Sequence, residues 1–214
     1  MFSKAHTIKP KKKAEKGTIR YDLHNFFEKA KSGDIINGVK CPEGQNLYEW
    51  LSVNGFDFLD EIQLLYSPIS DLCTPSNCPQ MNAGPQFEYL WMVDKKPTSM
   101  PAQQYCSELF IWASELFDDQ SIFPEEFKDK PPKKFMDTIT KIFKRLIRVY
   151  AHMFYSHMDD LKGNGNDQVA MQSFQHFFFF CREFKMLSKD DIAPLEPIIN
   201  EMCKEHGVPV FLEK

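Results

Sequence analysis

Two cysteines and two histidines place the strongest constraint on how this chain can fold. Cys73 and Cys78 stand in the turn-rich stretch LCTPSNCP, and His152 and His157 stand much later, in RVYAHMFYSH. Thiolates and imidazoles, paired here as C-x4-C and H-x4-H, are ligands that zinc takes in proteins. A structural zinc is bound by four protein ligands, whereas a catalytic zinc keeps one position open for water. The four residues therefore predict a structural Zn²⁺ site that joins two distant parts of the chain.

The same residues also have a simpler interpretation, as ordinary loop thiols and helix histidines. Their spacing is looser than that of a paired C-x2-C signature. The Thr-Pro-Ser-Asn sequence between the cysteines favours the metal site, because a metal knuckle needs such a bend. In an ideal helix His157 points well away from His152, so a shared zinc requires the helix to end or distort between them.

The length and composition fit a single domain. The chain has 214 residues, 43% of them apolar, which is enough to bury a core. No apolar stretch approaches the length of a membrane span, and no apolar region follows the basic N-terminus as in a signal peptide. Six cysteines at irregular spacings suit a reducing compartment, where thiols stay free or bind metal. We therefore expect a protein of the cytoplasm or nucleus, without membrane insertion.

Charge is distributed unevenly between the N-terminus and the rest of the chain. Residues 1–20 carry seven basic residues and one acidic residue, a net charge of +6, which leaves −10 on the rest of a chain with net charge −4. We expect residues 1–18 to form a flexible basic tail, because so few apolar residues cannot offset the entropy of ordering, and residues 19–214 to form one domain. By itself such a tail also suits nuclear import or nucleic-acid binding.

Helical periodicity dominates the domain and predicts an all-α fold. The element at 173–186 contains SFQHFFFFCREF, and its four consecutive phenylalanines cannot all face one side of a surface helix. We therefore expect this element to be central in a bundle. The aromatic stretch FEYLWMV at 87–93 is the best candidate for a short strand or hairpin arm, followed by a loop at 94–101. Apolar residues recur at three- and four-residue intervals in the other expected helices, at 22–33, 47–66, 102–117, 133–160 and 190–205.

The expected helix at 133–160 carries a basic stripe opposite its apolar face. Lys141, Lys144, Arg145 and Arg148 fall within a narrow arc of the helical wheel. The simple interpretation is a solvated helix face, on which alanine substitutions would barely change stability. The alternative is an anion site, because Arg145 and Arg148 are three residues apart and both guanidinium groups can reach one phosphate, with Lys144 as a nearby charge.

Four further segments occur in a fixed order along the chain: CTPSNCPQMNAGPQFEYLW, FKRLIRVYAHMFYSH, FQHFFFFCREF and APLEPII. Together they resemble the Mob (Mps-one-binder) family of kinase coactivators, over a span from about Thr7 to about Ile199. The resemblance implies a zinc-stabilised helical bundle with a four-helix core, additional helices and a short β-hairpin, and no enzymatic activity. It also implies two partners, a nuclear Dbf-related (NDR) or Lats-type kinase and a phosphorylated segment of an upstream Hippo- or Ste-type kinase.

The resemblance assigns roles to individual residues by position. The chain departs from the family pattern near Lys31, where a second regulatory threonine is expected, at Gln45, where the kinase-binding surface has an acidic residue, and in a short loop after Trp91. The matching positions are the zinc ligands Cys73, Cys78, His152 and His157, the phosphopeptide pocket Lys144, Arg145 and Arg148 with Lys95 and Lys96, the kinase-binding residues Glu49, Trp50 and Asp57, and the regulatory phosphoacceptor Thr7.

Three classes of function compete for this pattern. A zinc hydrolase would need an open coordination position and a neighbouring general base, but the MFYS segment between the histidines offers no carboxylate. A zinc-containing nucleic-acid-binding module would use the basic tail, but the acidic remainder and a pI of about 5.9 oppose it. A binding module that takes a phosphorylated partner and a basic kinase segment accounts for both charged surfaces. A Mob-like scaffold in a phosphatase or striatin-type complex is the alternative.

Overall fold

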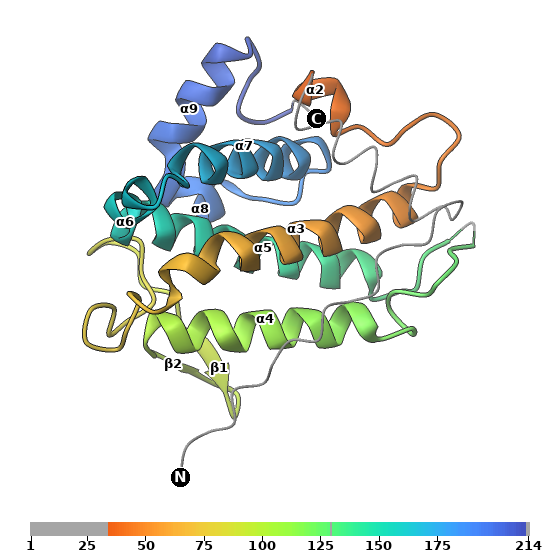
Figure 1. Cartoon of the computed structure of the whole chain (residues 1–214). Helices are drawn as coiled ribbons and strands as arrows, with labels where there is room; N and C mark the ends of the chain where they lie inside the picture. The colour runs from red at the N-terminus through yellow and green to blue at the C-terminus, as the bar shows by residue number, and fades with distance from the viewer. Residues whose placement is uncertain (1–33, 129, 213–214) are drawn as a thin grey trace.

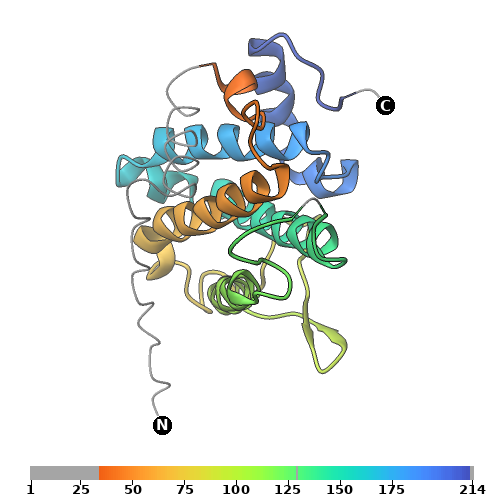
Figure 2. The same cartoon turned by 90° about the vertical axis from the view of Figure 1, so that its right-hand side faces the viewer.

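The computed structural model describes residues 34–128 and 130–212. At its centre lie four long helices, and α3 packs against the other three. Figure 1 shows them layered, and Figure 2, in which α4 is seen end-on, shows that α4 crosses the others at an angle. The expected all-α bundle is confirmed, whereas the predicted helix at 22–33, the basic tail and Thr7 lie outside the described residues. The four helices are α3 (Leu47–Ser70), α4 (Ala102–Asp118), α5 (Phe135–Ser156) and α7 (Asp167–Glu183).

The core between these helices is strongly aromatic. The ring of Phe58 on α3 lies 5.8 Å from that of Phe143 on α5, and 5.4 and 5.3 Å from those of Phe177 and Phe180 on α7. All three pairs meet edge to face, a favoured arrangement of aromatic rings. All four consecutive phenylalanines, 177–180, are at most 1% exposed, so the predicted central position of this helix is confirmed.

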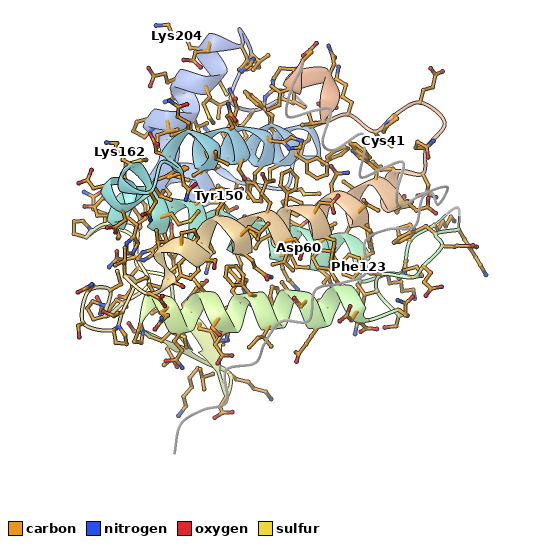
Figure 3. The ribbon with its side chains drawn as sticks, viewed as in Figure 1. Cys41, Asp60, Phe123, Tyr150, Lys162 and Lys204 are labelled. Carbon is orange, nitrogen blue, oxygen red and sulfur yellow. The ribbon has the colours of Figure 1, made fainter. Side chains whose placement is uncertain are left out.

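A few polar groups are buried among the described helices, and one pair of hydroxyls satisfies each other. Figure 3 shows Tyr150 among the helices, where its hydroxyl shares a hydrogen bond of 2.6 Å with that of Ser173 on α7. Burial of the two hydroxyls is tolerated because each satisfies the other. At the start of α3, the side chain of Asn46 caps the helix by accepting from the backbone N–H groups of Tyr48 and Glu49.

Shorter elements surround the four helices; in Figure 1, α2 and α9 lie above α7, and α6 lies at the left-hand end of the bundle. The predicted single helix at 190–205 is wrong, because the chain there forms three consecutive pieces. Pro194 and Pro197 explain the divisions, since proline lacks an N–H group and is accommodated in the first turn of a helix but not in its interior. The short elements are α2 (Ile35–Gly38), α6 (Met158–Gly163), α8 (Lys189–Ile192), the 3-10 helix η1 (Ala193–Leu195) and α9 (Glu196–Glu205).

A small hairpin precedes α4 and projects from the helical body, as Figure 2 shows. Strands β1 (Trp91–Val93) and β2 (Lys96–Thr98) pair antiparallel, with Trp91 opposite Thr98. Asp94 and Lys95 form the turn with positive φ angles of 48° and 66°, as a two-residue hairpin turn requires. A hairpin was expected, but its bounds were wrong: the strand begins only at Trp91, and the predicted loop supplies its partner.

Candidate metal centre and anion site

Four potential metal ligands meet where the loop after α3 approaches the end of α5. The ligand atoms of Cys73, Cys78, His152 and His157 all lie within 4.8 Å of one another, and all four residues are buried. Cys73 Sγ is 3.3 Å from His152 Nε2, and Cys78 Sγ is 3.4 Å from His157 Nε2. Zinc–ligand bonds of about 2.0–2.3 Å place neighbouring ligands of a tetrahedral site about 3.5 Å apart. The group therefore could hold a closed, four-coordinate metal ion, and its occupancy by Zn²⁺ stays a prediction.

The two cysteines are positioned by a tight turn at the end of α3. The N–H of Cys73 still donates to the last turn of that helix, at Ile69 O, over 2.9 Å. The N–H of Cys78 donates to Thr74 O over 2.7 Å, which closes the turn between the two thiols. The carbonyl of Cys78 then accepts from the N–H of Ala102 at the start of α4. The predicted knuckle is thus tied to two helices.

The two histidines reach the same site because α5 ends between them. His152 lies within α5, whereas His157 is the residue that follows its last turn, with φ −131° and ψ 19°, outside helical values. The chain resumes as α6 at Met158. The predicted end or distortion of the helix between the histidines is confirmed, and the single helix expected over 133–160 is corrected to two.

Each imidazole is oriented by a hydrogen bond from the nitrogen that does not face the thiols. His152 Nδ1 lies 2.8 Å from the carbonyl oxygen of Asn82, and His157 Nδ1 lies 2.8 Å from Asp160 Oδ2. When these nitrogens carry the proton and donate, Nε2 of each ring is left as a lone pair for a metal. The ring orientations therefore suit metal ligation.

Burial determines the charge states that these groups adopt without a cation. Burial raises the pKa of Cys73 to about 12, and it lowers the pKa of His152 to about 4. A neutral imidazole is the form that binds a metal, whereas buried thiolates need a nearby positive charge. A bound dication would supply that charge and would deprotonate the thiols.

Three basic residues of α5, Lys144, Arg145 and Arg148, form what we call the anion site. Lys144 Nζ is 3.0 Å from the carboxylate of Asp191 on α8. Burial of Asp191 opposes its ionisation, but hydrogen bonds from Ser188 and the nearby ammonium group lower its pKa below the usual value. The ammonium of Lys144 is therefore partly neutralised from within the protein.

Aromatic rings hold the two arginines of the anion site. Arg145 Cζ lies 4.4 Å from the ring centroid of Trp91 and 4.3 Å from that of Trp112. Arg148 donates from Nη1 to the hydroxyl of Tyr105 over 2.9 Å, and its Cζ lies 5.2 Å from the ring of Tyr89. The interpretation of this stripe as a solvated face is wrong for both arginines, because rings that lie far away in the sequence cover them.

Lys95 and Lys96 do not join the arginines in the described contacts. Lys95 occupies the turn of the hairpin and Lys96 starts β2, and both are exposed. Trp91, which contacts Arg145, stands at the opposite end of β1. A role for the two lysines in the anion site stays a prediction.

The predicted kinase-binding residues have different environments. Trp50 is fully buried, and its indole N–H donates to Val39 O over 3.1 Å, so it is a core residue and not part of an exposed surface. Glu49 and Asp57 are half-buried on α3. Glu49 accepts from the N–H of Phe127 over 3.3 Å and lines a pocket of about 190 Å³, the acidic pocket. Its other walls include Phe117, Phe123, Glu125, Glu126 and Phe127.

Sequence reasoning missed the rings around the arginines. Tyr105 and Trp112 are seven residues apart on α4, which is about two helical turns, so their shared face was a detectable signal. Tyr89 and Trp91 alternate along an extended segment and also share a face. The contact of these two faces with α5 could not be predicted, because it depends on the tertiary fold and periodicity reports only on single elements.

None of the helices within the described ranges has the length and apolar character needed to span a membrane.

Known proteins resemble this chain along most of its length. A profile of the Mob1/phocein family matches residues 28–195. The chain is 44% identical over 204 residues to MOB kinase activator-like 1 homolog C of Dictyostelium discoideum, covering 94% of each chain. It is 40% identical over 195 residues to maintenance of ploidy protein mob1 of Schizosaccharomyces pombe, covering 89% of this chain and 93% of that protein. Homolog B of D. discoideum is 40% identical over 205 residues, which cover 94% of this chain and 95% of that protein.

Proposed function

The chain belongs to the Mob1/phocein family, and from this premise we propose that it is a non-enzymatic coactivator and scaffold of an NDR- or Lats-type protein kinase. One surface binds the basic N-terminal regulatory segment of that kinase. A second surface, the anion site, binds a phosphorylated segment of an upstream Hippo- or Ste-type kinase or scaffold. The observation that carries the proposal is that one helical body holds a cluster of three cations and, apart from it, a pocket lined by three carboxylates.

The anion site supports the phosphopeptide half of the proposal. Two guanidinium groups and an ammonium group lie within one turn of α5, and phosphate is the dianion that such a group of donors binds best. Both arginines are already fixed by neighbouring rings. A site with these properties favours a compact dianion over a single carboxylate.

The acidic pocket supports the kinase half. Glu49, Glu125 and Glu126 contribute carboxylates to a pocket whose other walls include the rings of four phenylalanines. Such a surface suits a partner that presents basic side chains beside an apolar one, because the charges attract and the rings bury the apolar group. A basic regulatory segment has this chemistry.

The two surfaces lie at different positions along α4. Tyr105 contacts Arg148 of the anion site, and Phe117 lines the acidic pocket. These two residues are twelve positions apart, which corresponds to about 18 Å along a helix. Two partners could therefore be bound at once, which is what a scaffold between an upstream and a downstream kinase requires.

The other classes of function have less support. A metal bound by all four ligands of the buried group has no open position for a substrate, which argues against hydrolysis. The Mob-like scaffold of a phosphatase or striatin-type complex remains the second candidate, because the Mob1/phocein profile does not separate the two kinds of assembly.

The basic tail adds a regulatory element to the proposal. The net charge of +6 over residues 1–20 suits competition with the kinase segment for the acidic surface, and a phosphate on Thr7 would weaken that competition by adding negative charge. Deleting residues 1–18 should raise affinity for the kinase segment a few-fold at low salt and less at high salt, because screening shortens the reach of exposed charges. Equal affinities with and without the tail would exclude this competition.

Binding of the basic N-terminal segment of an NDR-type kinase to the zinc-loaded chain tests the central proposal. Glu49→Lys combined with Asp57→Lys should lower the affinity about tenfold or more, because two attractions become repulsions. A matched control, Glu196→Lys with Glu201→Lys, reverses two exposed carboxylates on α9 and should bind normally. Stimulation of kinase activity should fall in parallel. Undiminished binding by the α3 variant would reject this surface, and binding of a striatin-type partner instead would favour the alternative.

A further inference from the structure

Four aromatic residues, Tyr89, Trp91, Tyr105 and Trp112, surround the arginines of the anion site, and we call them the aromatic frame. They come from three places: the segment before the hairpin, strand β1, and α4. None of them carries a charge at neutral pH. Their possible role at the anion site therefore lies in what they do to the arginines.

Trp91 and Trp112 form a corner around the guanidinium group of Arg145. Their ring planes are nearly perpendicular, at 86°, with centroids 6.0 Å apart. The Arg145 guanidinium carbon lies over both rings, at 4.4 and 4.3 Å. A guanidinium group binds well to the faces of indole rings, so its position is fixed on two sides while its remaining N–H groups stay available.

Arg148 is fixed by a different contact in the same frame. The hydroxyl of Tyr105 accepts from Nη1 of Arg148 over 2.9 Å, and the Tyr105 side chain is fully buried. The ring of Tyr105 also meets that of Trp91 edge to face, with centroids 5.2 Å apart at 80°. Trp91 therefore contacts the residues that hold both arginines, so the two guanidinium positions depend on one packed unit.

Fixing the arginines in advance has a consequence for anion binding. A free arginine side chain loses much rotational freedom when it binds a ligand, and this loss lowers affinity. Arginines already held by rings lose little. Resting on the proposed function above, we propose that Trp112 and Tyr105 are positioning residues of the phosphopeptide site, which hold Arg145 and Arg148 so that both can bind one phosphate.

Two tryptophans of the frame provide a direct signal of binding. The chain has three tryptophans, and the third, Trp50, is buried in the core against Phe180. A phosphate that binds Arg145 draws charge away from the indole faces of Trp91 and Trp112. We expect phosphothreonine peptides to change the intrinsic fluorescence of the zinc-loaded chain, and their unphosphorylated forms to leave it unchanged.

The test measures the affinity of a phosphothreonine peptide pool by fluorescence and calorimetry for a set of variants. Trp112→Leu, which keeps apolar bulk but removes the ring, should lower affinity about tenfold, from typical cation–π strengths. Tyr105→Phe, which removes only the hydroxyl, should lower it about fivefold. Trp112→Phe should stay within about threefold of the parent because it keeps a ring. The control Lys141→Ala removes an exposed charge of the same stripe and should change affinity less than about twofold.

A double substitution separates positioning from a general structural role. Arg145→Lys keeps the charge but removes the planar group that the rings hold, so it should weaken binding by itself. If Trp112 acts through Arg145, adding Trp112→Leu to Arg145→Lys should weaken binding no further. Additive losses would show that Trp112 acts elsewhere. Thermal unfolding of each variant checks that it is folded. If Trp112→Leu does not fold, Tyr105→Phe carries the test of positioning.

The possible results separate this inference from the proposed function. One result would overturn the positioning role and leave the phosphate site in place. In this result Arg145→Ala abolishes the binding seen in the parent, whereas Trp112→Leu and Tyr105→Phe bind as the parent does. A parent chain that binds no phosphothreonine peptide overturns the phosphate site and the positioning role together. The graded losses described above support both.

Discussion

Two neighbouring stretches of α5 carry the side chains on which the protein's function is proposed to depend, and the fold treats them differently. In the last turns of the helix and directly after it, His152 and His157 are buried and face two thiols. One turn earlier, Arg145 and Arg148 are half-buried and face aromatic rings. The predicted metal ion would hold the histidines and the thiols together. The two arginines, in contrast, are already in contact with the aromatic rings around them. The difference suggests that losing a metal ligand removes the fold, whereas losing an arginine removes binding and only part of the stability.

The largest expected effect comes from removing a metal ligand. Cys78→Ser or His157→Ala should leave the chain largely unfolded, because binding of a structural zinc contributes about 10 kcal/mol or more to folding in small zinc domains. Circular dichroism measures the loss of helix, and metal analysis measures the loss of zinc. Cys41→Ser is the control, since Cys41 is a partly buried thiol outside the metal group. A folded parent chain that contains no zinc would contradict the proposal that the fold depends on a metal.

Acid should act on the metal-ligand stretch through His152. Burial lowers the pKa of His152 to about 4, from an ordinary value near 6.5. Below pH 6.5 the unfolded chain takes up a proton that the folded chain refuses, so stability is fully present above 6.5 and falls as the pH approaches 4. The loss should reach about 3.5 kcal/mol, at about 1.4 kcal/mol per pKa unit. Denaturant titration across this range measures it, and a stability that stays constant between pH 6.5 and pH 4 would contradict the prediction.

A glycine beside the metal-ligand stretch gives an intermediate effect. Gly84 has a φ of +80°, and a Cβ added there would overlap the ring of Tyr155. Gly84→Ala should destabilise the protein by about 1–3 kcal/mol and speed the loss of zinc, because the same loop carries the Asn82 carbonyl that orients His152. Gly44→Ala is a matched control with φ +78° and open space, so it measures backbone strain alone. Equal losses in the two variants would show that the contact with Tyr155 has no role.

The smallest expected effect on stability comes from removing an arginine of the anion site. Arg145→Ala should lower the free energy of unfolding by about 1–2 kcal/mol, because the side chain packs on two indole rings. Lys141→Ala, on the exposed part of the same stripe, should change it by less than about 0.5 kcal/mol. Urea unfolding of both zinc-loaded variants gives the difference. Equal free energies of unfolding for the two variants would show that Arg145 behaves as a solvated residue, as its spacing in the sequence suggests.

The candidate metal ligands could be predicted from the sequence because cysteine and histidine are residue types that commonly bind metal. Even the end of α5 before His157 followed from spacing, since a continuous helix would separate the two imidazoles. The oxygen atoms of Asn82 and Asp160 that orient those rings could not be found, because a backbone carbonyl carries no signature and Asp160 is one carboxylate among many.

The arginines illustrate the limit of periodicity. A helical wheel places Arg145 opposite the apolar face of α5, which is correct, but it does not show that Trp91 and Trp112 cover that side. Trp50 was misplaced for the same reason, because a motif match does not reveal burial. The division of the last helix at Pro194 and Pro197 was different, since both prolines were visible in the sequence and their effect was not taken into account.

The hairpin has a practical consequence. Its base is anchored by Trp91, which packs against Tyr105 and Trp112, whereas its turn at Asp94 and Lys95 is exposed. A peptide sequence inserted between these two residues would extend the hairpin outward and leave the helical body unchanged. The protein therefore offers an attachment point for an affinity tag or a fluorescent reporter, close to the site where a phosphorylated partner is proposed to arrive.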